Sequence, residues 1–167
     1  MSASLRTGER RLVTARRVGD GRVAFDTAAS GMLAWRMHAL AGVHVRSREG
    51  RPPAAASGLV VSVRLGPSVL RLAGLCRVEH VVVGSHEVSL TYRTLAEHVE
   101  DGVQTFRVVL RDDGAVEGAV ESRSRARHPV LGRAGLVGTL GQQLVAERYL
   151  NALERLARAV HDGRSAS

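Results

Sequence analysis

Four titratable side chains gather in one short segment of the sequence. Glu97, His98, Glu100 and Asp101 lie within five consecutive residues. A histidine flanked by carboxylates can transfer protons near neutral pH, and the same side chains can ligate a metal ion. The alternative is an ordinary polar loop in which His98 braces the backbone through hydrogen bonds. We favour this second interpretation, because no nucleophile and no second histidine stands at a recognised catalytic or ligand spacing.

Two alternating segments flank this cluster and are expected to position it. The first, 87–94, places apolar and hydroxyl side chains on one face, and the second, 103–110, alternates in the same way. The first face carries Val88, Leu90, Tyr92 and Thr94, and the second Gln104, Phe106, Val108 and Leu110. We therefore expect two strands joined by an acidic loop. On an apolar face, the hydroxyls of Tyr92 and Thr94 either orient a ligand or satisfy one another and nearby backbone.

The sequence before these strands predicts an edge strand, a helix and a loop. Residues 11–18 are expected to form the edge strand, with Leu12 and Val13 covering the core. Apolar residues at steps of three and four predict a helix over 24–42, capped by Asp26 or Thr27 and interrupted, if anywhere, at Gly31. A short strand over 43–45 and a proline-containing loop over 46–57 follow.

The remaining segments predict further strands and one long helix. Strands are expected over 59–65, 69–72 and 75–83, with a break at Ala73-Gly74, and then a hairpin at Asp112-Asp113-Gly114 leading to a strand over 115–122. Residues 123–135 read as a loop. The helix is predicted over 136–159. Its apolar stripe comprises Leu140, Leu144, Val145, Tyr149, Leu153, Leu156 and Val160.

This order of elements predicts an α+β fold, in which a curved antiparallel sheet of about six to seven strands wraps around the long C-terminal helix. Such a sheet has one wet face and one apolar face, and only that helix is long enough to cover the apolar one. A gap between the two layers is a common place for a ligand pocket. Gln142 and Tyr149 on the helix would face the same space as Tyr92 and Thr94.

Length and composition indicate a single domain. The chain has 167 residues, of which 44% are hydrophobic, and we expect one domain over 11–161 between flexible termini at 1–10 and 162–167. The lone Cys76 excludes an intramolecular disulfide and a cysteine-rich zinc site. The first residues lack the apolar run of a signal peptide, and no stretch approaches 18 apolar residues. We expect a cytoplasmic protein.

The net charge of +8 raises the alternative of an arginine-driven nucleic-acid binder. All 24 basic residues are arginine, which is typical of a coding sequence rich in G and C and selects no partner by itself. The arginines are also spread along the chain instead of forming one block. Nucleic acid is therefore not the partner that we favour.

Several segments in order resemble the uncharacterised DUF1990 domain family. The stretch from Tyr92 to Gly102, followed by Phe106, resembles its signature Tyr-Gly-Thr-Leu-x-Gly-His-Pro-Glu, a Gly-Glu-Glu step and a phenylalanine. The resemblance runs from about residue 18 to residue 156. The other matching pieces are Phe25 with Ala28, Trp35-Arg36-Met37-His38, Cys76-Arg77-Val78, Gln142 and Arg148-Tyr149-Leu150.

The sequence departs from the family pattern inside the signature. Arg93 and Glu97 replace glycines, Val99 replaces a proline, and Val103-Gln104 replaces two glutamates. Two carboxylates are thus missing where an acid–base pair could have been proposed. In layout the family is similar to the helix-grip, START-like superfamily of lipid and polyketide binders. This similarity implies a fold and no reaction.

The sequence therefore favours a non-catalytic or weakly catalytic binding domain, which holds a small hydrophobic or amphipathic molecule between the sheet and the C-terminal helix. The alternative is an enzyme that uses His98 and Glu100 with Tyr92 or Thr94 in the same cavity. We expect no cofactor, no metal and no membrane span, and the oligomeric state is left open. The predicted ligand-binding residues are Tyr92, Thr94, His98, Glu100, Phe106, Gln142 and Tyr149.

Overall fold

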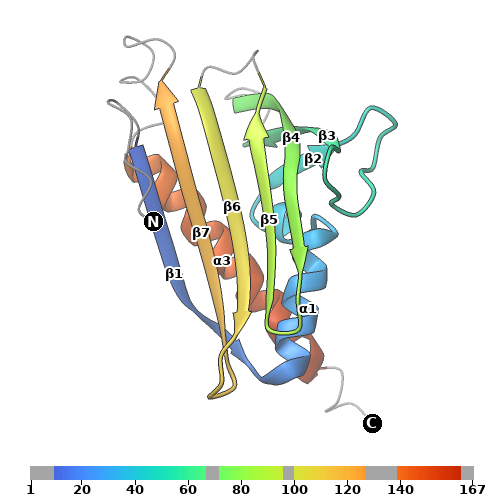
Figure 1. Ribbon diagram of the computed structural model, residues 1–167, viewed down its shortest axis with the longest axis vertical. Coiled ribbons are helices and arrows are strands. Elements are labelled where there is room, and N and C mark those ends of the chain that lie inside the picture. Colours follow the sequence, from blue (N-terminus) through green and yellow to red (C-terminus); the bar gives the residue numbers. More distant parts are fainter. Residues whose placement is uncertain (1–9, 67–71, 96–99, 127–138, 163–167) are drawn as a thin grey trace.

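The computed structural model describes residues 10–66, 72–95, 100–126 and 139–162 (Figure 1). Within these ranges, seven strands and three helices follow one another. Their order is β1 (Arg10–Asp20), α1 (Gly21–Leu33), α2 (Arg36–Leu40), β2 (Val43–Arg46), β3 (Val60–Leu65), β4 (Leu72–Val83), β5 (Glu87–Thr94), β6 (Glu100–Leu110), β7 (Ala115–Ala126) and α3 (Thr139–Asp162).

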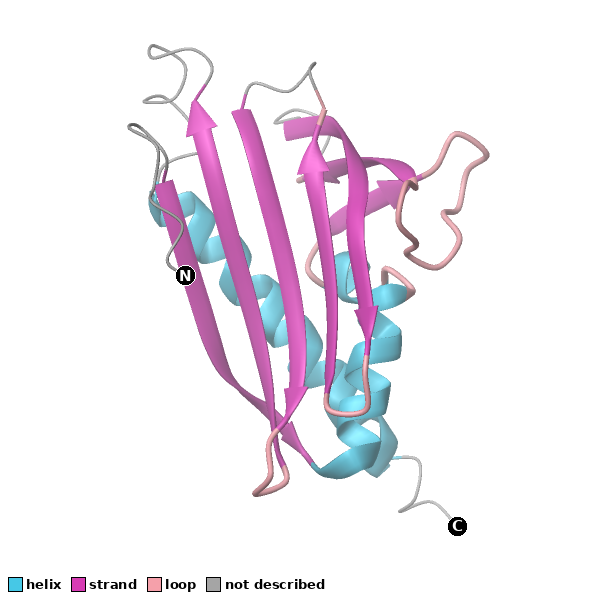
Figure 2. Ribbon diagram, viewed as in Figure 1, coloured by secondary structure: helices cyan, strands magenta, loops and turns pink. Residues whose placement is uncertain are grey.

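All seven strands form one antiparallel sheet in the order β1-β7-β6-β5-β4-β3-β2. The sheet curves, and α3 runs along one of its faces with α1 beside the C-terminal part of α3 (Figures 1 and 2). The predicted α+β fold and its number of strands are confirmed. β1 and β2 are the two edges of the sheet, as the sequence predicted for the first strand.

The register of the strands places the predicted apolar face toward α3. Leu90 pairs with Phe106, and Phe106 pairs in turn with Val120 of β7. These three side chains are at most 1% exposed. Burying them against the helix is the main stabilising contribution that a one-sided sheet can obtain.

The helix α3 covers this face with small and large apolar residues. Ala146, Tyr149, Leu150, Leu153, Leu156 and Ala157 are buried. The apolar stripe predicted from the sequence is partly wrong. It included Leu144, which is 53% exposed, and it omitted Leu150, which is fully buried. Polar contacts add to the packing, since the guanidinium of Arg16 on β1 reaches Glu147, Asn151 and Glu154 on α3.

The helix predicted over 24–42 is in fact two helices. α1 begins at Gly21, so Asp26 and Thr27 lie inside the helix and neither caps it. The break falls at Trp35, whose φ of 63° is left-handed, and not at Gly31. Trp35 is held there by its indole Nε1–H, which donates to the carbonyl oxygen of Pro53 at 2.8 Å. A bulky residue tolerates this strained conformation only when its surroundings hold it.

Three other strand predictions need correction. β4 is continuous through Ala73-Gly74, because these residues pair with Arg64 and Val63 of β3. β7 extends to Ala126 and takes in part of the predicted loop. Val13 does not cover the core, since it is 51% exposed and Val18 is the buried residue of β1. Residues 67–71 and 127–138, predicted in part as strand, loop and helix start, lie outside the described residues.

The face of the sheet away from α3 carries ion pairs between neighbouring strands and, for Arg123 with Glu121, within β7. They join Arg11 and Arg123 to Glu121, Arg93 to Glu79, Arg107 to Glu87, and Arg111 to Glu117. Hydrogen bonding from the Arg11 guanidinium is the main cause that lowers the pKa of Glu121. Much of the positive charge on this face is therefore matched locally. No helix of the described part is long and apolar enough to cross a membrane.

The closest approach of β1 to the helices depends on Gly19. A Cβ atom on this residue would lie 2.9 Å from the Cβ of Ala157 and 3.1 Å from that of Ala24, and neither methyl group can rotate away. We expect Gly19→Ala to lower the free energy of unfolding by about 1–3 kcal/mol, measured by urea denaturation. Adding Ala157→Gly should recover part of the loss. If it recovers none, the steric explanation is wrong.

Candidate ligand site

The predicted site residues of β5 and β6 lie on the face toward α3. Tyr92 and Phe106 are buried at 4% and 0% exposure, and their rings are 5.6 Å apart. Tyr149 of α3 closes on them from the opposite layer, with its ring 4.7 Å from that of Phe106. Three of the seven predicted residues therefore form one aromatic cluster between the sheet and the helix.

A histidine that the sequence did not single out completes this cluster. His38 of α2 is fully buried, and its Nε2 lies 3.5 Å from the Tyr92 hydroxyl. Its ring stands edge-on to the rings of Trp35, Phe106 and Tyr149 at 5.0–5.1 Å. The available signal was that His38 belongs to the segment Trp35-Arg36-Met37-His38, which resembles the DUF1990 pattern.

The cluster is polar but uncharged. Burial lowers the pKa of His38 to about 3, so its imidazole is neutral near pH 7. Burial likewise raises the pKa of both tyrosines, whose hydroxyls interact with each other, and the pKa of the nearby Cys76 thiol to about 12. One polar atom, Nδ1 of His38, is buried without a hydrogen-bond partner. Buried polar atoms of this kind are uncommon and need an explanation.

Thr94 and Gln142 lie further along the same face, toward the start of α3. The Thr94 hydroxyl accepts a hydrogen bond from the Gly102 N–H at 2.8 Å. The Gln142 amide donates to the hydroxyl of Ser124 at 2.9 Å, which joins the first turns of α3 to the end of β7. These two predicted residues are half-buried and connect neighbouring elements.

The acid–base hypothesis concerns two side chains that the structure does not describe. His98 lies outside the described residues, as do Glu97 and Val99. Glu100 is the first residue of β6 and pairs through its backbone register with Ala126, while its side chain is not described. The described residues contain no group of three histidine, cysteine or acidic side chains able to hold a metal ion. Roles for His98 and Glu100 remain predictions.

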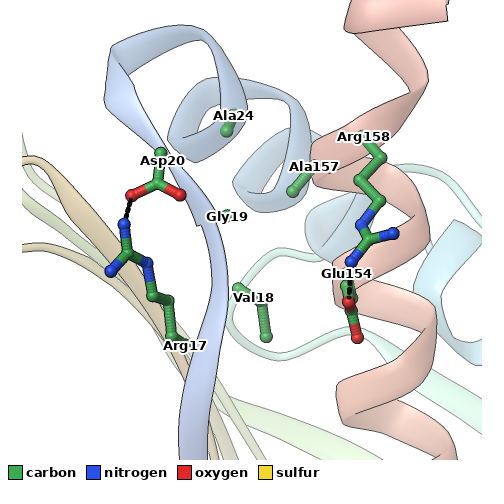
Figure 3. Close-up of a pocket in the computed structure, with 8 residues that line it drawn as sticks. All are labelled: Arg17, Val18, Gly19, Asp20, Ala24, Glu154, Ala157 and Arg158. Carbon is green, nitrogen blue, oxygen red and sulfur yellow. Dashed lines mark hydrogen bonds and ion pairs between the residues drawn. The ribbon is translucent and has the colours of Figure 1, made fainter.

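A surface cleft of about 330 Å³ opens at the other end of the sheet, where β1 leads into α1 (Figure 3). Its charged residues already pair with one another, Arg17 with Asp20 on one side and Arg158 with Glu154 on the other. Gly19 and small apolar side chains lie between them. Paired charges leave no excess of either sign for a ligand, so we assign this cleft no function.

Comparison with known proteins agrees with the sequence resemblance. Residues 2–152 match the family described as Domain of unknown function (DUF1990). The chain belongs to this family. The DUF1990 chain has no match among curated proteins.

Solved structures show that this DUF1990 domain has the helix-grip fold. A hypothetical protein from Helicobacter pylori matches with a TM-score of 0.61 at 11% identity, covering 90% of this chain and 88% of the other. Major latex-like protein 151 from Panax ginseng gives 0.59 at 9% identity, covering 87% and 95%. Norcoclaurine synthase from Thalictrum gives 0.57 at 11% identity, covering 90% and 97%. At these identities the likeness concerns the fold alone.

Proposed function

We propose that this domain binds a small hydrophobic or amphipathic molecule between its sheet and the N-terminal half of α3. The observation that carries the proposal is a step in polarity along the inner face of the sheet. One of the neighbours in fold is consistent with it. Norcoclaurine synthase was solved in complex with a transition state analogue, so this architecture can enclose a small molecule.

The step in polarity appears when the inner face is followed row by row across β5, β6 and β7. One row consists of Leu90, Phe106 and Val120, all sealed from solvent. The next row, toward the start of α3, consists of Tyr92, Gln104 and Ser122. The face that packs against the helix thus changes from apolar to uncharged polar within one pair of residues.

Several side chains of the polar rows are also less tightly covered than those of the apolar row, although Tyr92 and Ser124 are buried. Gln104, Ser122 and Thr94 are half-buried, as is Gln142 on the helix opposite. Uncharged hydroxyl and amide groups beside an aromatic floor are typical of a pocket that holds a mostly apolar ligand and orients it with a few hydrogen bonds. The proposed ligand therefore rests on the rings of Tyr92, Phe106 and Tyr149, with Thr94 and Gln142 near its outer end.

A neutral fluorescent probe tests this proposal directly. We expect N-phenyl-1-naphthylamine to bind with one-to-one stoichiometry, to gain fluorescence and to raise the melting temperature, because a ligand that binds only the folded state stabilises it. Native mass spectrometry after incubation with a lipid and metabolite extract should retain a small-molecule mass. Absence of probe binding, retained mass and thermal shift would contradict the proposal.

Two matched serine substitutions locate the bound probe. Ser122→Phe adds a ring on the inner face of β7, whereas Ser89→Phe adds the same ring on the outer face of β5. We expect the first change to weaken probe binding by at least about tenfold, while the second leaves it unchanged. If the space is instead packed, Ser122→Phe should destabilise the fold by about 1–3 kcal/mol through overpacking. That loss of stability would argue against an inner pocket.

A further inference from the structure

The described side chains at the floor of the proposed pocket are polar or apolar, and none of them is charged. Among the described residues, the only buried polar side chains are His38 and Ser124. Tyr92 and Tyr149 add two buried hydroxyls. The charged residue on the inner face of β1, Arg16, is already engaged by Glu147 and Glu154 of α3. An ionised ligand group beside His38 would therefore find no opposite charge among the described side chains, and a buried, unpaired ion is strongly disfavoured.

One nitrogen of the His38 imidazole has a partner, and the other has none among the described residues. Its Nε2 faces the hydroxyl of Tyr92 at 3.5 Å, while its Nδ1 is buried with no partner. In a neutral imidazole, one nitrogen donates a hydrogen bond and the other accepts one. The buried Nδ1 thus has no partner among the described residues, and a neutral group of a bound ligand would supply one.

A hydroxyl group meets this requirement in either tautomer of His38. If Tyr92 donates to Nε2, then Nδ1 carries the proton and needs an acceptor. If Nε2 donates to Tyr92, then Nδ1 needs a donor. A hydroxyl can be both, whereas a carbonyl can only accept and an ammonium group can only donate.

We propose that the ligand is an uncharged alcohol or phenol with an apolar body, whose hydroxyl bonds to Nδ1 of His38. The assignment rests on the proposed function and adds the chemical class of the ligand. The apolar body lies against Phe106 and Tyr149. His38 and Tyr92 act together as the element that selects a neutral oxygen over a carboxylate or an amine.

Three naphthalene compounds of nearly equal size separate the alternatives at pH 7. 2-Naphthol is a neutral phenol, 2-naphthoate carries a carboxylate, and naphthalene has no polar group. We expect 2-naphthol to bind about tenfold more tightly than either of the other two, as one hydrogen bond in a buried site would provide. In His38→Leu this advantage over naphthalene should disappear, while His44→Gln, at an exposed histidine of β2, should keep it.

A second measurement does not depend on a variant that folds. The ¹⁵N resonances of the His38 ring in the wild-type protein should shift when 2-naphthol binds, and they should not shift with naphthalene. If no compound binds, both the proposed function and this inference fail. If all three compounds bind equally and the His38 resonances stay unchanged, the proposed ligand class is wrong, while the proposed binding function is retained. Equal ring shifts with naphthalene and with 2-naphthol would show that the shifts do not report a hydrogen bond from a ligand hydroxyl, which also overturns the inference.

Discussion

Phe106→Ala is expected to lower the free energy of unfolding by about 3–5 kcal/mol, the range for removing a fully buried aromatic ring. Phe106 is 0% exposed and lies between the two layers of the domain. Its ring contacts those of His38, Tyr92 and Tyr149 at centroid distances of 5.1, 5.6 and 4.7 Å. Removing it deletes the central side chain of the cluster and leaves a cavity that its rigid neighbours cannot fill.

Urea denaturation followed by circular dichroism measures this loss. Val109→Ala is a suitable control, because Val109 lies on the same strand but on the outer, half-exposed face. Val109→Ala should lower the free energy of unfolding by less than about 1.5 kcal/mol. A loss below about 1.5 kcal/mol for Phe106→Ala itself would show that this ring borders open space on one side. In that case the empty part of the site would extend deeper than the row of Tyr92.

The strands were predictable because their signal is local. In β5 and β6, alternate residues differ in polarity, and this alternation alone assigns Leu90, Tyr92 and Phe106 to the face that α3 covers. The hairpin at 112–114 was equally clear, since Gly114 adopts a φ of 84°, which favours glycine. These features depend on residues close together in the sequence.

The errors arise where distant segments decide the conformation. Nothing near Trp35 breaks a helix, and the break is stabilised by Pro53, 18 residues away. Ala73 and Gly74 have low intrinsic strand propensity, yet they belong to β4 because β3 provides their pairing partners. Local propensity was thus overridden by tertiary contacts.

The candidate ligand site was only partly predictable for the same reason. The densest titratable group, around His98, attracted attention because its residues are adjacent in the sequence. The polar cluster of the core instead joins His38 to Tyr92, 54 residues apart, and to Tyr149 on the last helix. Only the sheet register and the packing of α2 bring these residues together. The sequence identifies Tyr92, Phe106 and Tyr149 as site residues, but it does not identify His38, which contacts all three.

Stability is expected to fall as the pH decreases from about 6.5 toward 3, and His38 is the cause. The pKa of His38 is about 3 in the folded state because of burial, against about 6.5 for an unfolded chain. At pH values between these two pKa values, His38 is protonated in the unfolded state and neutral in the folded state. Lowering the pH therefore favours unfolding. Protonation of His38 lowers the free energy of unfolding by about 1.4 kcal/mol per pH unit in this range. Between pH 6.5 and pH 3 the total decrease is roughly 4–5 kcal/mol.

Comparison with His38→Leu isolates this contribution from that of the carboxylates. Chemical denaturation at pH 7, 6, 5 and 4 should give curves for the wild type and His38→Leu that converge as the pH falls, because the leucine variant has no proton to exclude. The other groups of the cluster cannot produce the effect, since burial raises the pKa of Cys76 to about 12 and keeps the tyrosines protonated. The plot of stability against pH for His44→Gln should be parallel to that of the wild type. Parallel curves for His38→Leu would mean that His38 takes up a proton in the folded state, which requires water or a charge beside Nδ1 and would remove the basis for a neutral ligand.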